Sequence, residues 1–455
     1  MNRTGHIMMK LKAGMPLKAP CHLDVMVGAS RPLNTIDAGG ALDRIMHRRT
    51  SAMRVRRVFH AHRSLGRFGE QAAHFDDLEQ GLGLSQTLSV ELADRDQCDA
   101  VVADLRSLDH VDWATSEQLS FTCFESQTLS AESISKQDVW QPFLHVGGRE
   151  ALEMEPGSKD IHVAVIDTGV ALEHHELIGK LHTGFDTVDL GMGVVSSGVR
   201  LVGDSYGRDF CARDETGHGT HVASVLGANG LHVAPGVAGL SRVIPVRALA
   251  AAQIEDDKLV GVGGIMDINA AIKVAVDLGA NVLNMSFGTP AVSLGDKEPV
   301  PHEDVMGYAL NRGVIPIAAI GNSGTQEHYY PAALDGVIAV GSMSLDGQHS
   351  SFSTTGNHIA LCAPGENIIS AGLKGYRLST GTSHATPYVS GAAALLLARA
   401  KRAGYALSAE QARDILCETA TPGAATATRT MIGSGMLNIP AALHRLDQTM
   451  TEMTR

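Results

Sequence analysis

The chain has 455 residues, of which 19% are charged and 44% hydrophobic, and its formal net charge is −12. This length is sufficient for two or more domains with buried cores. The excess of acidic residues argues against a general role in binding nucleic acid or anionic membranes. No apolar run approaches the roughly 20 residues that are needed to span a bilayer.

Residues 1–20 contain lysines but no continuous apolar segment. We therefore predict a flexible lead without a secretory signal and a cytoplasmic protein, with secretion as the alternative. The cysteines lack CxxC or metal-type spacing, which favours free, buried thiols in a reducing compartment over paired disulfides. The six cysteines are Cys21, Cys98, Cys123, Cys211, Cys362 and Cys417.

Between residues 21 and 123 the hydrophobic pattern predicts a small α+β domain. The predicted strands are residues 23–27, 53–59, 87–92 and 111–119, and the predicted helices are residues 34–48 and 94–108. The order β-α-β-β-α-β is that of the ferredoxin-like, split βαβ plan. Such a domain can be a regulatory module, a binding module or a pro-segment, and the pattern alone favours none of these.

Residues 124–138 are predicted to form a linker. The segment 125–136 is rich in Ser, Glu and Gln and lacks apolar periodicity, which is typical of an exposed connection. Exposed polar linkers are the segments that proteases cut most easily, so we expect a processing site here.

Residues 139–445 are predicted to form an α/β domain, followed by a tail of residues 446–455. Alternating βα units imply a mainly parallel sheet with helices on both faces. In such a sheet the functional side chains lie just beyond the carboxyl ends of the strands. The predicted strands are residues 161–166, 243–249, 282–286, 314–320 and 337–340, and the predicted helices are residues 218–226, 265–278, 303–311, 385–403 and 409–419.

Ser383 lies in the segment GTSHATPYVSG, residues 381–391, where a glycine turn precedes a predicted helix. The N-terminus of a helix offers backbone donors and a dipole that favour a developing negative charge, which suits a serine nucleophile. The alternative is an ordinary turn or helix cap.

Three other polar residues lie in places that suit chemistry. Asp167 follows an apolar strand in VAVIDTG, and a buried carboxylate there needs a partner such as an imidazole. His218 is flanked by glycines in ETGHGTHVAS, so nothing bulky blocks its ring. Asn322 follows another strand in AAIGNSG, where its amide could donate to an oxyanion. The alternatives are turn residues at Asp167 and Asn322, and a zinc pair formed by His218 and His221, which lacks an HExxH motif or third ligand.

Together with LNMSFG, these segments resemble, in the same order, the motifs of the subtilisin-like (subtilase) serine peptidases. The resemblance covers roughly residues 141–443. It implies a triad in which Ser383 is the nucleophile, His218 the general base and then acid, and Asp167 the group that orients the imidazole. Asn322 would complete the oxyanion hole. The resemblance thus implies a serine endopeptidase that forms an acyl-enzyme on peptide or protein substrates and requires no cofactor.

The resemblance also implies a substrate cleft bordered by Ser286, Phe287 and Gly288, in which the peptide binds as an added strand. Phe287 would help to form a hydrophobic side-chain pocket, and the alternative is a core aromatic residue at a strand end. Glu327 or His328 would lie near the base of this first pocket and bias side-chain preference.

Two further expectations follow from comparison with the family pattern. His384 stands where the family usually has methionine after the serine, and we interpret it as a tolerated change at the rim of the site. Calcium often stabilises relatives, but no EF-hand-like spacing is present. We interpret the candidate ligands as solvated loop acids and assign no metal site. These acids are Asp186, Asp189, Asp204 and Asp214.

Subtilases commonly carry a ferredoxin-like pro-domain that assists folding, inhibits the cleft through its tail and is removed by self-cleavage. The resemblance implies that residues 21–123 are such a pro-domain, acting as intramolecular inhibitor and chaperone. The alternative is a permanently attached recognition domain.

Two other functions compete with a serine peptidase. Asp-Thr-Gly at residue 167 also begins aspartic-peptidase sites, but that class needs a second aspartate and the chain has no second DTG. The other is a catalytically silent subtilase-fold binding scaffold, against which the presence of all four chemical groups argues.

Overall fold

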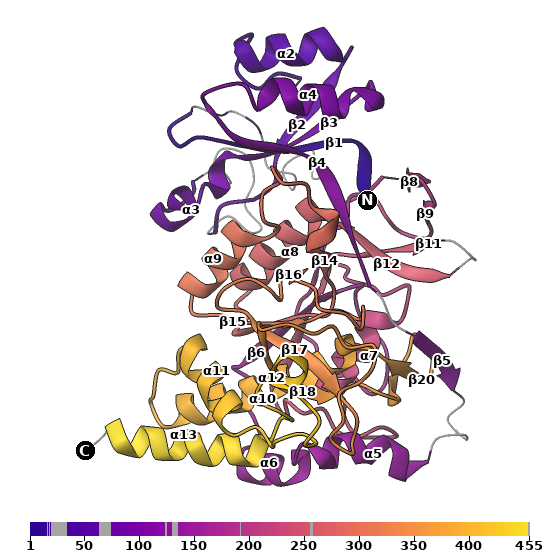
Figure 1. The fold of residues 1–455 in the computed structure, drawn as a ribbon, viewed down its shortest axis with the longest axis vertical. Coiled ribbons are helices and arrows are strands. Elements are labelled where there is room, and N and C mark those ends of the chain that lie inside the picture. Colours follow the sequence, from indigo (N-terminus) through magenta and orange to yellow (C-terminus); the bar gives the residue numbers. More distant parts are fainter. Residues whose placement is uncertain are drawn as a thin grey trace.

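The computed structural model contains two packed units that share one sheet (Figure 1). The structure describes residues 1–15, 17, 19, 34–62, 74–122, 125–129, 135–191, 193–254 and 258–453. We call the described residues up to 122 the N-terminal unit and those from 135 to 453 the C-terminal unit. Across these ranges no helix combines the length and the apolar character needed to cross a bilayer.

The C-terminal unit is built on a seven-stranded sheet with the order β18-β17-β15-β13-β6-β10-β7. All neighbouring strands pair in parallel, as the alternation of strand and helix patterns predicted. The bounds are β6 His162–Asp167, β7 Phe185–Asp186, β10 Arg242–Arg247, β13 Val282–Met285, β15 Ile315–Ala319, β17 Ile338–Met343 and β18 Ile359–Pro364. The edge strands β7 and β18 are absent from the prediction.

Helices cover both faces of this sheet. They are α7 His218–Gly227, α8 Ile265–Asp277, α9 Glu303–Asn311, α10 Thr382–Arg402 and α11 Ala409–Glu418, and the structure confirms each prediction within three residues. Because successive strand residues point to opposite sides, Val163 and Val165 of β6 pack with α7 and α10. Ala164 and Ile166 pack with α8 and α9 on the other face.

The C-terminal unit continues beyond its predicted end. Helix α13 runs over Ile439–Met453, and Leu446 on this helix is fully buried in the core. The prediction of a tail from residue 446 is therefore wrong for residues 446–453. Leu443, Leu446 and Met450 recur at helical spacing and extend one apolar face past the predicted boundary.

The N-terminal unit contains an antiparallel sheet with the strand order β2-β3-β1-β4. Helix α2 lies between β1 and β2, helix α4 lies between β3 and β4, and the short helix α3 precedes β3. The bounds are β1 Asn2–Leu11, α2 Ala41–Arg49, β2 Met53–Arg57, α3 Asp77–Gly81, β3 Thr87–Leu92, α4 Cys98–Leu105 and β4 Val111–Phe121.

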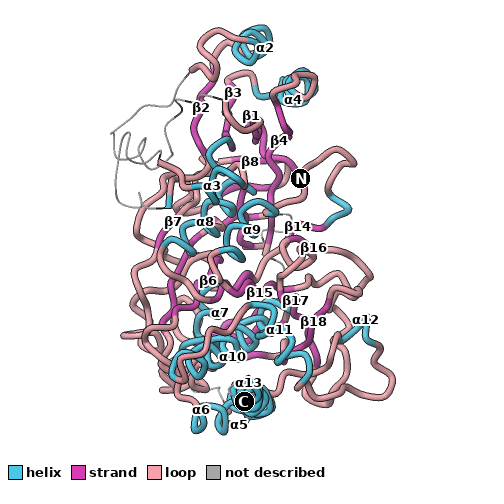
Figure 2. The backbone as a smooth tube through the Cα atoms, turned by 90° about the vertical axis from the view of Figure 1, so that its left-hand side faces the viewer, coloured by secondary structure: helices cyan, strands magenta, loops and turns pink. Residues whose placement is uncertain are grey.

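The first strand is β1, so the prediction of a flexible lead over residues 1–20 is wrong for residues 2–11. The strand predicted at residues 23–27 lies outside the described residues. Ile7 and Met9 pack against α2 and α4, whereas Met8 packs against the α8 side. The strand is thus covered on both faces at this point. Its residues 7–9 are three consecutive apolar residues, where a half-exposed strand would alternate apolar and polar residues. Figure 2 shows these layers from the side, with α2 and α4 outermost, then the N-terminal sheet, then α8 and α9.

Strand β4 joins the two units, running from the N-terminal sheet into the body of the protein (Figure 1). It pairs with β1 and, further along, with β12 (Leu259–Gly264) of the C-terminal unit. At its end Phe121 bridges to Gly288. One continuous eight-stranded sheet, β2-β3-β1-β4-β12-β11-β9-β8, therefore crosses the boundary. Its last three strands are β11 Ala250–Gln253, β9 Val199–Leu201 and β8 Val194–Ser196.

The predicted linker is partly ordered into a sheet. Strand β5 (Glu125–Leu129) pairs antiparallel with β20 (Tyr376–Thr380), with Glu125 opposite Thr380. Helix α5 (Lys136–His145) then begins inside the predicted linker. The segment predicted as a linker over residues 124–138 is therefore partly in regular secondary structure, because a polar strand without apolar alternation can still pair through its backbone.

The units also meet through buried charges. Lys273 Nζ of α8 lies 2.7 Å from Glu79 Oε1 of the N-terminal unit and 2.7 Å from Asp277 Oδ2, and all three side chains are fully buried. His60 and His62 of the N-terminal unit contact the same Asp277 carboxylate at 2.9 and 2.8 Å. Removing one of these partners would leave the remaining charges buried and uncompensated, without water to solvate them. The buried charges of the two units are therefore complementary.

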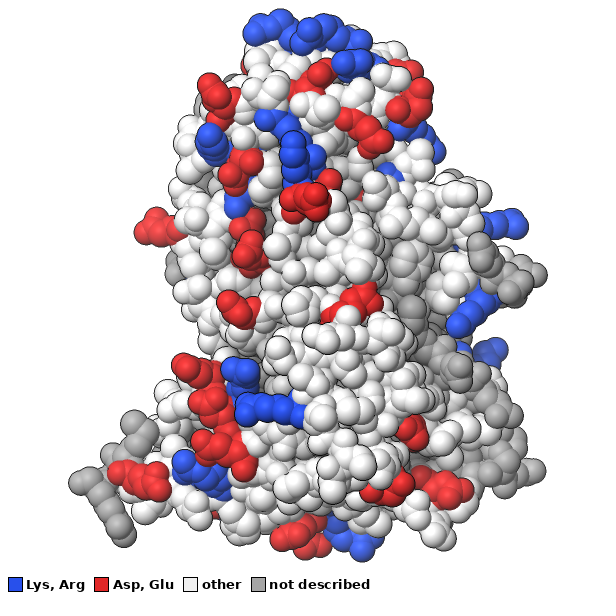
Figure 3. Space-filling model, in the orientation of Figure 1, with Lys and Arg blue, Asp and Glu red and all other residues white. Residues whose placement is uncertain are grey.

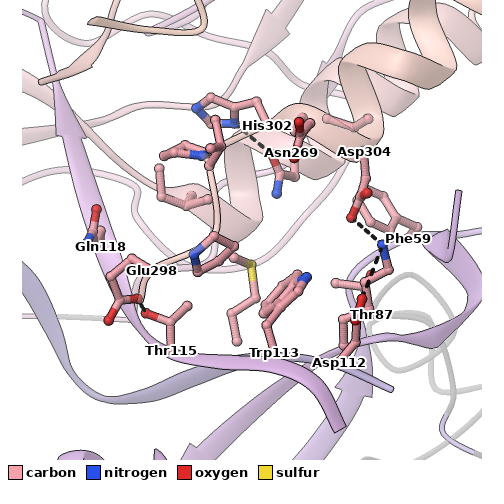
Figure 4. Close-up of a pocket in the computed structure, with 18 of the residues that line it drawn as sticks. Phe59, Thr87, Asp112, Trp113, Thr115, Gln118, Asn269, Glu298, His302 and Asp304 are labelled. Atoms are coloured by element: carbon pink, nitrogen blue, oxygen red, sulfur yellow. Dashed lines mark hydrogen bonds and ion pairs between the residues drawn. The ribbon is translucent and has the colours of Figure 1, made fainter. Parts of the chain in front are cut away.

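A cavity of about 370 Å³ lies between the units and away from the candidate site (Figure 4). Trp113 and Gln118 of β4 line one side, and Asn269 of α8 and His302 line the other. On the outer surface, Lys and Arg gather over α2, and both signs of charge mix over the rest of the face in Figure 3. That face therefore carries no continuous basic surface.

Candidate active site

The candidate residues converge at the carboxyl edge of the seven-stranded sheet, as the sequence predicted. Asp167 is the last residue of β6, and Ser286 directly follows β13. Asn322 lies just beyond the end of β15. His218 begins α7, and Ser383 is the second residue of α10. Five segments that are far apart in the chain thus meet in one place.

Asp167 and His218 form a buried pair. The Nδ1 atom of His218 lies 2.7 Å from Oδ1 of Asp167, and both side chains are fully buried. With a carboxylate as acceptor, Nδ1 carries the proton and Nε2 points away from Asp167. Gly219 permits this approach, because a Cβ at that position would lie 3.1 Å from the Asp167 Cβ.

The loop before α7 is held by Asp214, which the sequence interpretation did not place in the site. Its Oδ1 accepts from Thr168 Oγ1 at 2.8 Å and from the Thr216 backbone N–H at 2.9 Å. Its Oδ2 accepts from the N–H and hydroxyl of Thr220, in the first turn of α7. Asp214 therefore fixes the segment that carries His218. The sequence signal that could have indicated this role is the position of an acid four residues before a histidine that begins a helix.

Ser383 lies at the N-terminus of α10 and is almost fully buried. Its hydroxyl donates to the Ser286 carbonyl at 3.0 Å, and the Ser286 hydroxyl donates to the Ser383 carbonyl at 2.9 Å. These reciprocal bonds tie the start of α10 to the end of β13. The neighbouring His384 ring lies 5.6 Å from that of His218, which places the starts of α7 and α10 side by side.

Asn322 is oriented by Thr382, a residue that the sequence interpretation did not single out. The backbone N–H and the hydroxyl of Thr382 both donate to Asn322 Oδ1, at 2.9 and 2.8 Å. The two bonds fix the amide oxygen on the Thr382 side, and Asn322 lines the same cavity as Ser383.

Two histidines beside the pair are buried. His221 donates from Nε2 to the Ile368 carbonyl at 2.9 Å, as expected for a packed histidine, and burial lowers its pKa to about 3. His384 is fully buried against His221, with ring centroids 4.3 Å apart. The prediction that His384 lies at the rim is therefore wrong, because its helix position points it toward α7. Burial, and then His221 and His218, lower the pKa of His384 well below its usual value.

A cavity of about 260 Å³ adjoins Ser383 and Asn322. Ser286, Phe287 and Gly288, the residues expected to border a substrate cleft, line this cavity. Phe287 also packs in the hydrophobic core. Glu327 and His328 are not among the lining residues. Tyr329 lines the cavity, together with Phe121 and Thr122 of the N-terminal unit.

The acids considered for calcium are used otherwise. Asp186 pairs with Arg247 at 2.6 Å and Asp189 with Arg56 at 2.8 Å, both in buried surroundings. Asp214 holds the loop before α7, and only Asp204 is exposed. The interpretation as solvated loop acids is therefore wrong for Asp186, Asp189 and Asp214, whereas Asp204 is exposed. Over the part of the chain that the structure describes, no group of three or more His, Cys, Asp or Glu side chains is placed to hold a metal ion.

The sheet gathers these polar residues at the carboxyl ends of its strands, the edge at which α/β enzymes hold their functional side chains. The model of the subtilase family matches residues 158–435, and the chain belongs to this family.

Relatives support this membership. The chain is 36% identical over 256 residues to a thermophilic serine proteinase of Bacillus sp. (strain AK1), covering 55% of each protein. It therefore spans about half the length of that relative. It is 36% identical over 244 residues to the major intracellular serine protease of Bacillus subtilis (strain 168), covering 52% of this chain and 68% of that protein. Among solved structures it is similar to the prenylagaramide maturation protease PagA, with a TM-score of 0.52 and 30% identity, covering 66% of this chain and 98% of that chain.

Proposed function

We propose that the protein is a serine endopeptidase in which Asp167, His218 and Ser383 form the triad and Asn322 supplies an oxyanion donor. The observation that carries the proposal is the buried pair of Asp167 and His218, beside a helix start that presents Ser383. A serine hydroxyl is a weak nucleophile at neutral pH and needs an adjacent base, which an imidazole held by a carboxylate provides.

The proposed reaction proceeds in two halves. Ser383 Oγ bonds to the substrate carbonyl carbon while its proton passes to His218 Nε2, and the resulting oxyanion accepts from Asn322 Nδ2 and the Ser383 N–H. The C–N bond then breaks, and the leaving amine takes the proton from His218. Water repeats the sequence on the acyl-enzyme, which releases the acid and restores the serine. No organic cofactor enters these steps.

Asn322→Ala is expected to lower kcat by roughly 10²–10³, a size measured for the corresponding donor in subtilisin itself. The amide stabilises charge that exists only in the transition state, so KM should change little. Steady-state kinetics on a chromogenic peptide measure this. Asn311→Ala, on the exposed side of α9, serves as the matched control. A fall in kcat below threefold would remove Asn322 from the oxyanion role.

We infer further that the N-terminal unit is a ferredoxin-like pro-domain and an intramolecular inhibitor. Its strand order β2-β3-β1-β4, with α2 and α4 in the connections, supports the fold. Two paired segments support the inhibition. Phe121 bridges to Gly288 and the Thr122 N–H donates to the Gly261 carbonyl at 3.0 Å, so the end of the unit lies along the cleft. A substrate could not bind there as an added strand at the same time.

Self-processing is proposed within the short interval between Thr122 and Glu125. Thr122 lines the cavity beside Ser383, and Glu125 pairs with Thr380, three residues before Ser383. The purified wild-type protein is expected to acquire a new N-terminus in this interval, which intact-mass and N-terminal analysis detect. Active enzyme that still begins at Met1 would favour a permanently attached domain.

The competing function is a silent binding scaffold. It predicts equal background hydrolysis of casein by the wild type and by Ser383→Ala, whereas the proposed function predicts hydrolysis by the wild type alone. Inhibition by a serine-reactive phosphonate tests the same point chemically.

A further inference from the structure

The cavity beside Ser383 contains an aromatic ring that has no role in the steps described above. We propose that the Tyr329 ring shortens the pocket for the residue before the scissile bond and restricts the enzyme to peptides with a small side chain there. This inference rests on the proposed peptidase function and deepens it by naming the class of substrate.

Tyr329 lies between the two walls of the cavity. Gly288, beyond the end of β13, belongs to one wall, and Gly321, beyond the end of β15, belongs to the other. A Cβ built on Gly288 would lie 3.1 Å from Cδ1 of Tyr329, and a Cβ built on Gly321 would lie 2.6 Å from Cδ2. Cδ1 and Cδ2 are on opposite edges of the ring, so the ring fills the width of the slot between the two glycines.

The slot adjoins the atoms that are proposed to react. Asn322 directly follows Gly321 in the chain, and both share the lining of the cavity with Ser383 and Tyr329. A substrate carbonyl held against Ser383 and Asn322 directs the side chain of its own residue between the walls. A methyl or hydroxymethyl group fits in front of the ring, whereas a benzyl group or a long aliphatic chain needs the volume that the ring fills.

Backbone pairing holds the ring in place. The strand that carries it, β16 (Tyr329–Tyr330), pairs antiparallel with β14 (Thr289–Pro290), which directly follows the wall glycine. The Ala291 N–H also donates to the His328 carbonyl at 2.8 Å. The backbone of Tyr329 and one wall of the slot therefore belong to the same two-stranded ribbon, which fixes the attachment point of the ring relative to that wall.

The test compares two peptides that differ only in alanine or phenylalanine before the scissile bond. For the wild type, kcat/KM is expected to favour alanine. Tyr329→Gly is expected to raise kcat/KM for the phenylalanine peptide, relative to the alanine peptide, by roughly 10–100-fold, the range that one or two missing contacts produce in a side-chain pocket. Tyr329→Phe keeps the ring and is expected to leave the ratio unchanged.

A wild-type ratio near one, or an unchanged ratio in Tyr329→Gly, overturns the inference. If Tyr329→Gly fails to fold, Tyr329→Leu keeps apolar contact with the walls and should shift the ratio in the same direction by a smaller factor. A ratio compares two substrates on one preparation and does not depend on the specific activity. If the wild type cleaves neither peptide faster than Ser383→Ala does, the proposed peptidase function is contradicted instead. The two failures are therefore distinguishable.

Discussion

Replacing Ser383 by alanine is expected to lower the turnover of peptide substrates by roughly six orders of magnitude, the size measured when the nucleophile of subtilisin itself is removed. The methyl group cannot bond to the carbonyl carbon, so only water attack assisted by the oxyanion donors remains. Single-turnover and steady-state assays on a chromogenic peptide measure the loss. The same variant should stay uncut at its full length of 455 residues, because self-processing uses the same hydroxyl.

The matched control is Ser197→Ala, in the exposed turn between β8 (Val194–Ser196) and β9 (Val199–Leu201), which should process and turn over like the wild type. Because the Ser383 hydroxyl also donates to the Ser286 carbonyl, thermal unfolding of Ser383→Ala should be compared with that of the control. A folded Ser383→Ala protein that retains a tenth of the wild-type activity would contradict the proposed mechanism.

Asp167→Asn is expected to lower kcat by about 10⁴, with little change in fold or KM. The carboxylate accepts from Nδ1 of His218 at 2.7 Å and so keeps Nε2 free of a proton. An asparagine can present its Nδ2–H₂ to Nδ1 instead, which moves the imidazole proton to Nε2, where it can no longer receive the serine proton.

Nitrogen NMR of the labelled imidazole provides a second readout, because the two tautomers give different shifts. Asp160→Asn, an exposed acid near Lys401, is the matched control and should change neither kcat nor the tautomer. A normal kcat in Asp167→Asn, or a loss of activity without a change of tautomer, would show that Asp167 does not act by orienting the imidazole.

The candidate site was largely predictable because its residues lie next to strong local signals. Strands β6 and β15 are buried on both faces and appear in the sequence as apolar runs, and Asp167 and Asn322 lie at or just beyond their ends. His218 is the first residue of a helix and Ser383 the second residue of another, and a glycine precedes each helix. Their convergence follows from parallel order, since the carboxyl ends of parallel strands share one edge.

The supporting residues were not predictable in the same way. Thr382 orients Asn322 through two hydrogen bonds, and Asp214 fixes the loop that carries His218. Both are polar residues in turn-rich segments, where such residues usually serve local turns. Only the approach of separate segments shows which partners their oxygens and N–H groups have.

By itself the sequence determined the βα order of the C-terminal unit, the family and the identities of the four residues proposed for the chemistry. These are encoded in short-range periodicity and in motifs a few residues long. Only the tertiary structure decided that residues 2–11 form an inner strand, that Thr122 lies in the cleft, and that the Tyr329 ring fills the slot beside Ser383. Each of these depends on contacts between segments far apart in the chain. Such contacts are not encoded in the hydrophobic periodicity of either segment alone.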